Sequence, residues 1–120
     1  MTDHFKPTIY FKHACPYCFK VQVALLEAGL LNAVEIVEFV PGDDKEAQIR
    51  ELLGTKLEKV TFPAAELSAG KYLADSDGII EALVADANGV MPELPTLKAY
   101  IDGPLKRIQT LNKEVNQLKG

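Results

Sequence analysis

Cys15 and Cys18 are the only cysteines of this 120-residue chain, and their spacing suits them for chemistry. They stand three positions apart in Cys15-Pro16-Tyr17-Cys18, after the apolar residues 8–11 and at the start of a helical pattern. Free N–H groups and the positive dipole end at a helix start stabilise a thiolate, which is the reactive form of cysteine. The spacing also lets Cys18 attack a mixed disulfide formed on Cys15. The motif therefore predicts reversible dithiol–disulfide chemistry, in which Cys15 attacks and Cys18 resolves.

Three other interpretations of the cysteine pair stay open. A structural disulfide would close so small a loop that it would constrain little of the unfolded chain. A zinc site could be completed by His4 and His13, although His13 lies only two residues from Cys15, a poor spacing for tetrahedral coordination. The thiols could also be inert core residues. His13 itself could tune the Cys15 thiolate or relay a proton, or it could be a solvated residue at a strand end.

The first half of the chain shows the hydrophobic patterns of alternating strands and helices. This alternation favours two parallel strands joined by right-handed crossovers. The elements expected are a strand at residues 8–11, a helix at 18–29 opened by Pro16, a strand at 34–40, and a helix from Asp43 to Leu53 with Asp43 and Glu46 as its capping box.

The second half predicts a hairpin and a further helix. Residues 64–67 and 71–73 flank a turn at 68–70, and Asp75 or Ser76 then caps a helix that ends near Gly89. The complete order is β-α-β-α-β-β-α, an α/β class. The inward face of that helix is expected to contain Ile79, Ile80, Leu83, Val84 and Ala87.

The last 30 residues predict a linker at 91–95 and one helix that starts at residues 102–104. An apolar stripe on so short a helix must be covered. We expect it to pack against the chain's own domain, and a homodimer through this helix is the alternative. The stripe consists of Ile101, Ile108, Leu111, Val115 and Leu118.

Size and charge limit the classes of function. A chain of this length forms one domain that needs no metal or staple. The net charge of −4 argues against nucleic acid as a partner. Residues 96–120 carry five Lys or Arg against two Asp or Glu, which suits docking on an acidic body.

With no secretory signal and no apolar run of membrane length, we expect a cytoplasmic protein without a membrane partner. In that reducing compartment a lone cysteine pair is more often catalytic than structural.

Three motifs in this order resemble the thioredoxin fold, and specifically glutaredoxins. Lys12 precedes Cys15 as in the Lys-x-x-Cys-Pro-Tyr-Cys stretch of glutaredoxins. Residues 61–63, Thr-Phe-Pro, resemble the glutaredoxin Thr-Val-Pro, whose proline follows a cis peptide bond. Residues 70–77 are similar to the Gly-x-x-x-Gly-Gly-Ser-Asp of glutaredoxins and to the Leu-x-Glu-Ser of glutathione transferase N-terminal domains. The resemblance implies a thioredoxin fold with a mixed four-stranded sheet over residues 1–90, and a C-terminal helical extension over 91–120.

The resemblance also implies a glutathione site. Glutathione would be a co-substrate, with no metal and no tightly bound cofactor. The backbone of Phe62, before Pro63, would pair with the cysteinyl part of glutathione. Ser76 and the helix start would hold the γ-glutamyl carboxylate and Asp77 the amino group, although both residues could serve only as a helix cap. The residues implied are Cys15 and Cys18 for catalysis, and Lys12, Tyr17, Phe62, Pro63, Ser76 and Asp77 for glutathione.

Two departures from the glutaredoxin pattern concern this site. Residues 74–75, Ala-Asp, replace the Gly-Gly pair and place negative charge near the expected anion site. The segment between Gly54 and Pro63 is longer than in glutaredoxins, so several residues are candidates for the glycine carboxylate. These are Lys12, Gln48, Arg50, Lys56 and Lys59.

The function expected is a glutathione-dependent thiol–disulfide oxidoreductase that reduces protein or small-molecule disulfides. One alternative is a minimal glutathione-transferase-like domain that conjugates electrophiles, which the transferase-like motif supports. A second is a non-catalytic binding module, against which the second cysteine argues. The motif also leaves open an iron–sulfur cluster held by Cys15 and glutathione across a dimer.

Overall fold

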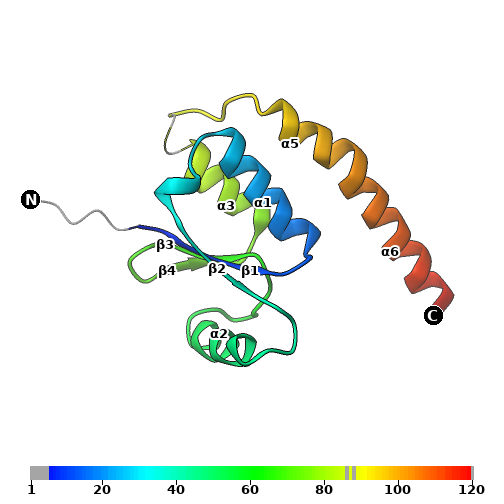
Figure 1. Cartoon of the computed structure of the whole chain (residues 1–120), viewed down its shortest axis with the longest axis horizontal. Coiled ribbons are helices and arrows are strands. Elements are labelled where there is room, and N and C mark those ends of the chain that lie inside the picture. Colours follow the sequence, from blue (N-terminus) through cyan, green and yellow to red (C-terminus); the bar gives the residue numbers. More distant parts are fainter. Residues whose placement is uncertain (1–5, 86, 88, 120) are drawn as a thin grey trace, which may run out of the picture.

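A four-stranded sheet with helices on both faces forms the body of the protein (Figure 1). The computed structural model describes residues 6–85, 87 and 89–119. The elements are β1 (Thr8–Lys12), α1 (Pro16–Glu27), β2 (Glu35–Phe39), α2 (Asp44–Gly54), β3 (Ala64–Ser68), β4 (Lys71–Leu73), α3 (Ser76–Ile80), α5 (Pro95–Tyr100) and α6 (Lys106–Lys119). A 3₁₀ turn lies at Leu31–Ala33, and π-helical turns follow α3 at Glu81–Ala85 and join α5 to α6 at Ile101–Leu105.

The sheet has the order β2-β1-β3-β4. Strands β1 and β2 are parallel, whereas β3 pairs antiparallel with both β1 and β4. Ile9 in the centre of β1 lies opposite Ile36 on one side and Ala65 on the other. The predicted α/β class, the crossover of the first half and the hairpin of the second are confirmed. The chain has the mixed four-stranded sheet of the thioredoxin fold.

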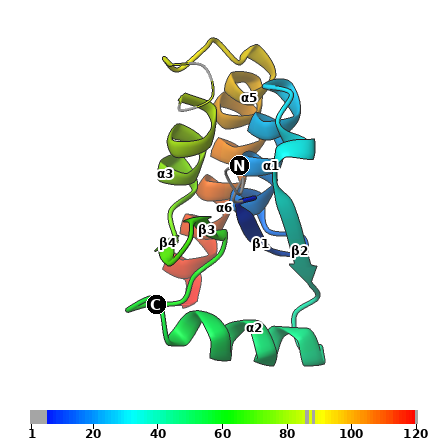
Figure 2. The ribbon, with the colours of Figure 1, turned by 90° about the vertical axis from the view of Figure 1, so that its left-hand side faces the viewer.

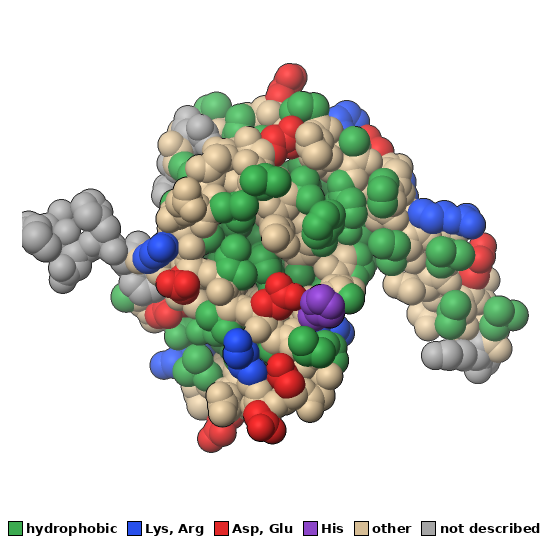
Figure 3. All heavy atoms as spheres, in the orientation of Figure 1, with side chains coloured by type: hydrophobic (Ala, Val, Ile, Leu, Met, Phe, Trp, Pro, Cys, Tyr) green, Lys and Arg blue, Asp and Glu red, His purple; other side chains and the backbone are tan. Residues whose placement is uncertain are grey.

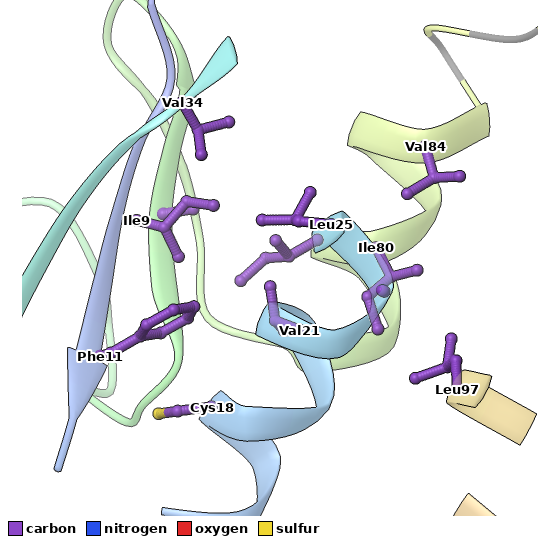
Figure 4. Close-up of a cluster of buried hydrophobic side chains, with 12 residues drawn as sticks. Ile9, Phe11, Cys18, Val21, Leu25, Val34, Ile80, Val84 and Leu97 are labelled. Carbon is purple, nitrogen blue, oxygen red and sulfur yellow. The ribbon is translucent and has the colours of Figure 1, made fainter. Parts of the chain in front are cut away.

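Alternation along β1 divides the core into two layers, because successive side chains of a strand point to opposite faces. Ile9 and Phe11 face α1 and α3, and Figure 4 shows them pointing toward Val21 and Leu25 of α1. Tyr10 points to the other face of the sheet, into a smaller hydrophobic cluster between the sheet and α2. Figure 2 shows α2 on the side of the sheet opposite to α1 and α3.

The predicted starts of α2 and α3 are confirmed, and the structure decides between the two cap residues predicted for α3. Asp43 accepts a hydrogen bond from the Glu46 N–H at 2.8 Å, and the Glu46 carboxylate accepts one from the Gly42 N–H at 2.7 Å, which completes the capping box of α2. Asp75 caps α3 by accepting from the Gly78 N–H at 3.0 Å, so Ser76 is the first residue of that helix. Residue 87 is helical and Gly89 is a bend with φ = +80°, which agrees with the predicted end of this helix near Gly89; residues 86 and 88 lie outside the described residues.

The predicted start of the last helix at residues 102–104 is wrong. The helical segment begins at Pro95, seven residues earlier. Pro95 needs no hydrogen bond at the first position, and the Glu27 carboxylate at the end of α1 accepts from the Thr96 and Leu97 N–H groups at 2.8 and 2.9 Å. Pro104 lies inside the π-helical turn and does not begin a helix. The cap comes from a distant part of the chain, which the local sequence does not show.

The expected burial of the whole apolar stripe is also wrong. Ile101 packs against the main core and Ile108 is half-buried, but Leu111, Val115 and Leu118 are 41, 45 and 88% exposed. The buried anchors of the extension are Leu97 and Leu105. Figure 1 shows α6 continuing away from the sheet, so its second half has no described surface of the body to pack against.

Hydrophobic side chains gather on the face drawn in Figure 3. Two exposed hydrophobic residues of α1 are Phe19 and Leu26, with 51 and 66% of their area exposed. They line an apolar groove between α1 and α5, together with Val23, Ala99 and Pro104. Among the described helices, none is long and apolar enough to cross a membrane.

Changing Glu27 to Gln is expected to lower the melting temperature by loosening α5 from α1. Burial opposes ionisation of Glu27, but the N–H groups of Thr96 and Leu97 outweigh it and lower the pKa of this carboxyl. A lowered pKa in the folded state stabilises the protein above the pKa of the unfolded carboxyl, about 4.3, and this contribution is lost as the pH falls through the folded pKa.

The measurement is thermal unfolding of the wild type and Glu27→Gln between pH 3 and 7. The gap in melting temperature should be full near neutrality and shrink as the pH falls toward 3. Glu51→Gln, a change at an exposed residue of α2, is the matched control. A gap that is the same at every pH would contradict the capping role of the carboxylate.

Candidate functional site

The two thiols meet at the start of α1. Cys15 is the N-cap residue, and its sulfur accepts a hydrogen bond from the Cys18 N–H at 3.4 Å. Pro16 occupies the first helical position, where its missing N–H costs nothing. Both cysteines are free thiols; Cys15 is half-buried, whereas Cys18 is 3% exposed and packs in the main core. A second molecule can therefore reach the sulfur of Cys15 but not that of Cys18.

Electrostatics separate the two thiols further. The hydrogen bond from the Cys18 side chain lowers the pKa of Cys15 to about 6, in spite of its partial burial, with help from the Cys18 and Tyr17 N–H groups and the Lys12 charge. The same side-chain hydrogen bond, together with burial, raises the pKa of Cys18. The Lys12 N–H donates to Cys18 Sγ at 3.3 Å. Near neutral pH the pair is therefore a thiolate at Cys15 and a protonated thiol at Cys18.

The segment before β3 lies beside the reactive sulfur. The Phe62–Pro63 peptide bond is cis, as predicted. Cys15 Sγ lies 3.9 Å from the Phe62 carbonyl oxygen, to which the sulfur can donate only in its protonated form. The Phe62 ring packs edge-to-face on Phe39 at 4.7 Å, and the Arg50 guanidinium lies 5.2 Å from its centre. Arg50, one of the five residues considered for the glycine carboxylate, therefore lies beside this segment, and its Nε donates to the Glu46 carboxylate at 2.7 Å.

Most of the residues predicted to bind glutathione line one cleft of about 390 Å³, called here the polar cleft. Lys12 does not line it. Lys12 lies instead on a second hollow of about 550 Å³, called here the thiol cavity, which Cys15 and Cys18 also line. The predicted residues in the polar cleft are Tyr17, Phe62, Pro63, Ser76 and Asp77.

Lys20 is a residue of the polar cleft that the sequence analysis missed. Its side chain is 8% exposed, and its Nζ donates to Ser76 Oγ at 3.4 Å and to the Asp77 carboxylate. The Asp77 side chain is 79% exposed, so one end of this ion pair is inside the protein and the other faces the solvent. A signal was present: Lys20 stands between Cys18 and Val21 on the buried side of α1, a position that normally holds an apolar residue.

The C-terminal extension forms part of the site as well. The Tyr100 hydroxyl donates to the Pro16 carbonyl oxygen at 2.7 Å, and its ring packs edge-to-face on Phe19. Gln109 Nε2 donates to the Tyr17 hydroxyl at 3.3 Å. Tyr100 lines the thiol cavity and Gln109 the polar cleft. The extension, which was expected to pack against the chain's own domain, thus also supplies a wall to both hollows.

Among the residues that the structure describes, no cluster of zinc ligands supports the zinc interpretation of the cysteine pair. No group of three or more His, Cys, Asp or Glu side chains there comes together as metal ligands would. His4, one of the two histidines proposed for that site, lies outside the described residues. His13 is paired with Glu38 instead, with His13 Nδ1 at 2.8 Å from Glu38 Oε2.

Comparisons with known proteins agree with this geometry. Residues 14–86 match the sequence pattern of the family described as "Glutathione S-transferase, N-terminal domain". The match covers both cysteines, the Phe62–Pro63 segment and the polar cleft as far as α3. No curated protein matches the chain.

Solved structures of glutathione transferases are similar in fold. Glutathione transferase Omega 3C from Trametes versicolor has a TM-score of 0.53 at 22% identity, over 83% of this chain and 43% of that chain. Glutathione transferase Omega 2C from the same organism gives 0.49 at 24% identity, over 87 and 44%. A glutathione S-transferase from the Antarctic clam Laternula elliptica gives 0.47 at 22%, over 73 and 37%. The chain spans less than half the length of these proteins.

Proposed function

Because the chain belongs to the glutathione S-transferase N-terminal domain family, we propose that it binds glutathione and catalyses glutathione-dependent thiol–disulfide exchange at Cys15. The observation that carries this proposal is the placement of the two thiols, with half-buried Cys15 as the N-cap of α1 under the Cys18 N–H and Cys18 itself 3% exposed. A thiolate at Cys15 with a protonated thiol three residues away is the arrangement that disulfide exchange needs. A conjugating transferase has no use for the second thiol.

The polar cleft supports glutathione as the co-substrate. The Phe62 backbone oxygen at the Cys15 sulfur offers an edge for the cysteinyl part of the tripeptide. The exposed Asp77 carboxylate suits the γ-glutamyl amino group, and Ser76 and the buried Lys20 suit the carboxylate beside it. Arg50 near Phe62 suits the glycine carboxylate. Lys20, Phe62, Ser76 and Asp77 line the polar cleft, and Arg50 lies beside it on the Phe62 ring.

The proposed cycle starts from a mixed disulfide of glutathione with another thiol. The Cys15 thiolate attacks the glutathione sulfur, a new bond forms between Cys15 and glutathione, and the original S–S bond breaks, with its electron pair going to the sulfur of the other thiol, which is released. A second glutathione thiolate then attacks the Cys15 adduct and leaves as oxidised glutathione. For protein disulfides, Cys18 loses its proton and displaces the bound partner, which forms the Cys15–Cys18 disulfide that glutathione later reduces. This cycle suits a reducing compartment such as the cytoplasm.

Conjugation of electrophiles is the second candidate, favoured by the family and by the apolar side chains around Cys15. Phe11, Phe19 and Ile108 line the thiol cavity and offer apolar surface next to the sulfur. In that reaction a glutathione thiolate would attack an electrophile, and Cys15 would not form a covalent bond.

Two assays run side by side on the same preparation separate the candidates. The first is glutathione-coupled reduction of a small glutathione mixed disulfide, and the second is conjugation of glutathione to a chlorodinitrobenzene. We expect turnover in the first and a rate near the uncatalysed background in the second. Strong conjugation without disulfide reduction would overturn the proposal in favour of the transferase function.

A further inference from the structure

Two side chains at the thiol cavity, those of His13 and Glu38, take no part in the cycle above. His13 and Glu38 line the cavity together with Cys15. His13 Nδ1 lies 2.8 Å from Glu38 Oε2, and the two side chains are 61 and 46% exposed. The pair is therefore open to a molecule that reaches the Cys15 sulfur.

The backbone between His13 and Cys15 takes an unusual conformation. Ala14 has φ = +61°, the only positive φ of a non-glycine residue among those that the structure describes. The Cys15 N–H donates to the Lys12 carbonyl at 3.3 Å, and the His13 N–H donates to the Phe39 carbonyl at 2.8 Å. A left-handed alanine is unfavourable, and such residues collect at functional sites. The tight turn that results brings the side chains on both sides of Ala14 onto one cavity.

The hydrogen bond to Glu38 fixes which ring nitrogen is available. An ionised carboxylate only accepts hydrogen bonds, so Nδ1 carries the proton that it shares with Glu38. Nε2 is then the ring nitrogen that Glu38 leaves free to hold a second proton. Lys45 on α2 donates its Nζ to the Glu38 carbonyl at 3.3 Å, which holds this part of β2 in place. The other ionisable groups that line the cavity are Lys12, Cys15, Cys18 and Tyr100.

We propose that His13 is the general acid that protonates the leaving thiolate when Cys15 attacks a disulfide, and that Glu38 positions its ring. This inference rests on the proposed thiol–disulfide exchange. The bond between Cys15 and the attacked sulfur forms as the substrate S–S bond breaks, and the electron pair of that bond goes to the leaving sulfur. The leaving sulfur takes the proton from His13 Nε2 and departs as a neutral thiol. Neutral His13 regains a proton from water.

A general acid helps most when the leaving thiolate is basic. An alkyl thiolate holds a proton strongly and gains from protonation as the S–S bond breaks. An aromatic thiolate such as thionitrobenzoate is stable without a proton and gains little. The ratio of the rates on the two kinds of disulfide therefore reports proton donation, whereas a loose site would slow both reactions together.

The experiment measures thiol release from two mixed disulfides of glutathione, one with 2-mercaptoethanol and one with thionitrobenzoate, by excess reduced protein in a single turnover. In His13→Asn we expect the ratio of the alkyl rate to the aromatic rate to fall at least about tenfold. Glu38→Gln should lower the same ratio by a smaller factor. Glu35→Gln, a change at an exposed residue three positions earlier on β2, is the matched control and should keep the wild-type ratio.

Each outcome bears on a different claim. An unchanged ratio in His13→Asn, whether the rates fall together or stay the same, overturns the general-acid role and leaves the proposed function standing. A wild type that releases no thiol from either disulfide overturns the proposed function, and the role of His13 with it. A ratio that falls equally in Glu35→Gln assigns the effect to the surface charge of β2 and overturns the inference.

Discussion

Replacing Cys15 with serine is expected to abolish glutathione-coupled disulfide reduction, with a loss of about 10³-fold or more. The pKa of the Cys15 thiol is lowered to about 6, so the wild type presents a thiolate at neutral pH. A serine hydroxyl at the same helix start holds its proton far more strongly and forms no adduct with glutathione. The measurement is the steady-state rate with a small glutathione mixed disulfide, and detectable wild-type turnover in Cys15→Ser would contradict the account.

Cys18→Ser is the matched variant that separates the two thiols. It should keep the reduction of glutathione mixed disulfides, because a second glutathione clears the Cys15 adduct without a resolving thiol. The serine hydroxyl can also still donate to the Cys15 sulfur, which is the main cause of the low pKa. Reduction of protein disulfides through the dithiol route should be lost. Equal and complete loss of both activities in Cys15→Ser and Cys18→Ser would rule out this division of roles.

Lys20→Met is expected to raise the KM for glutathione by about tenfold and to destabilise the chain by roughly 1–3 kcal/mol. Lys20 is 7% exposed overall and its Nζ reaches both Ser76 and Asp77. Without the ammonium, the Asp77 carboxylate loses the partner that holds it at the polar cleft, and the Ser76 hydroxyl loses a donor. The measurements are the glutathione dependence of turnover and thermal unfolding.

Two further variants test the role of Lys20. Lys20→Arg should retain part of the glutathione affinity, because a cation still reaches Asp77. Lys113→Met, at an exposed position of α6, should behave as the wild type. If Lys20→Met lowers the melting temperature while the KM stays unchanged, the ion pair serves the fold alone and the polar cleft is not organised by it.

Local patterns predicted the parts of the molecule that local physics determines. The Cys15 motif with Pro16 predicted the helix start, and the Asp43–Glu46 capping box formed as expected. Each of these signals depends on residues within one helical turn. The parallel pairing of β1 with β2 and the β3–β4 hairpin followed from the pattern of strands and helices, because short crossovers restrict the topology, whereas the mixed four-stranded sheet was implied by the resemblance.

The features that sequence reasoning missed depend on contacts between distant residues. Lys20 meets Asp77 across 57 positions, and its burial becomes acceptable only because α3 supplies an anion. The start of α5 at Pro95 depends on Glu27, 69 positions before Thr96. The exposed Leu111 and Val115 follow from the path of α6 beyond the body, which no periodicity reveals.

The most direct test of the account is the pH dependence of cysteine alkylation in the reduced protein. Iodoacetamide is added at pH values between 4.5 and 9, and the labelled peptide is identified by mass mapping. The account predicts that Cys15 alone is labelled, with a midpoint at about pH 6. Cys18 should stay unlabelled over this range, because it is buried and its pKa is raised. Preferential labelling of Cys18, or a Cys15 midpoint near about 8.5 as in a free thiol, would contradict the central claim that the start of α1 makes Cys15 the attacking thiolate.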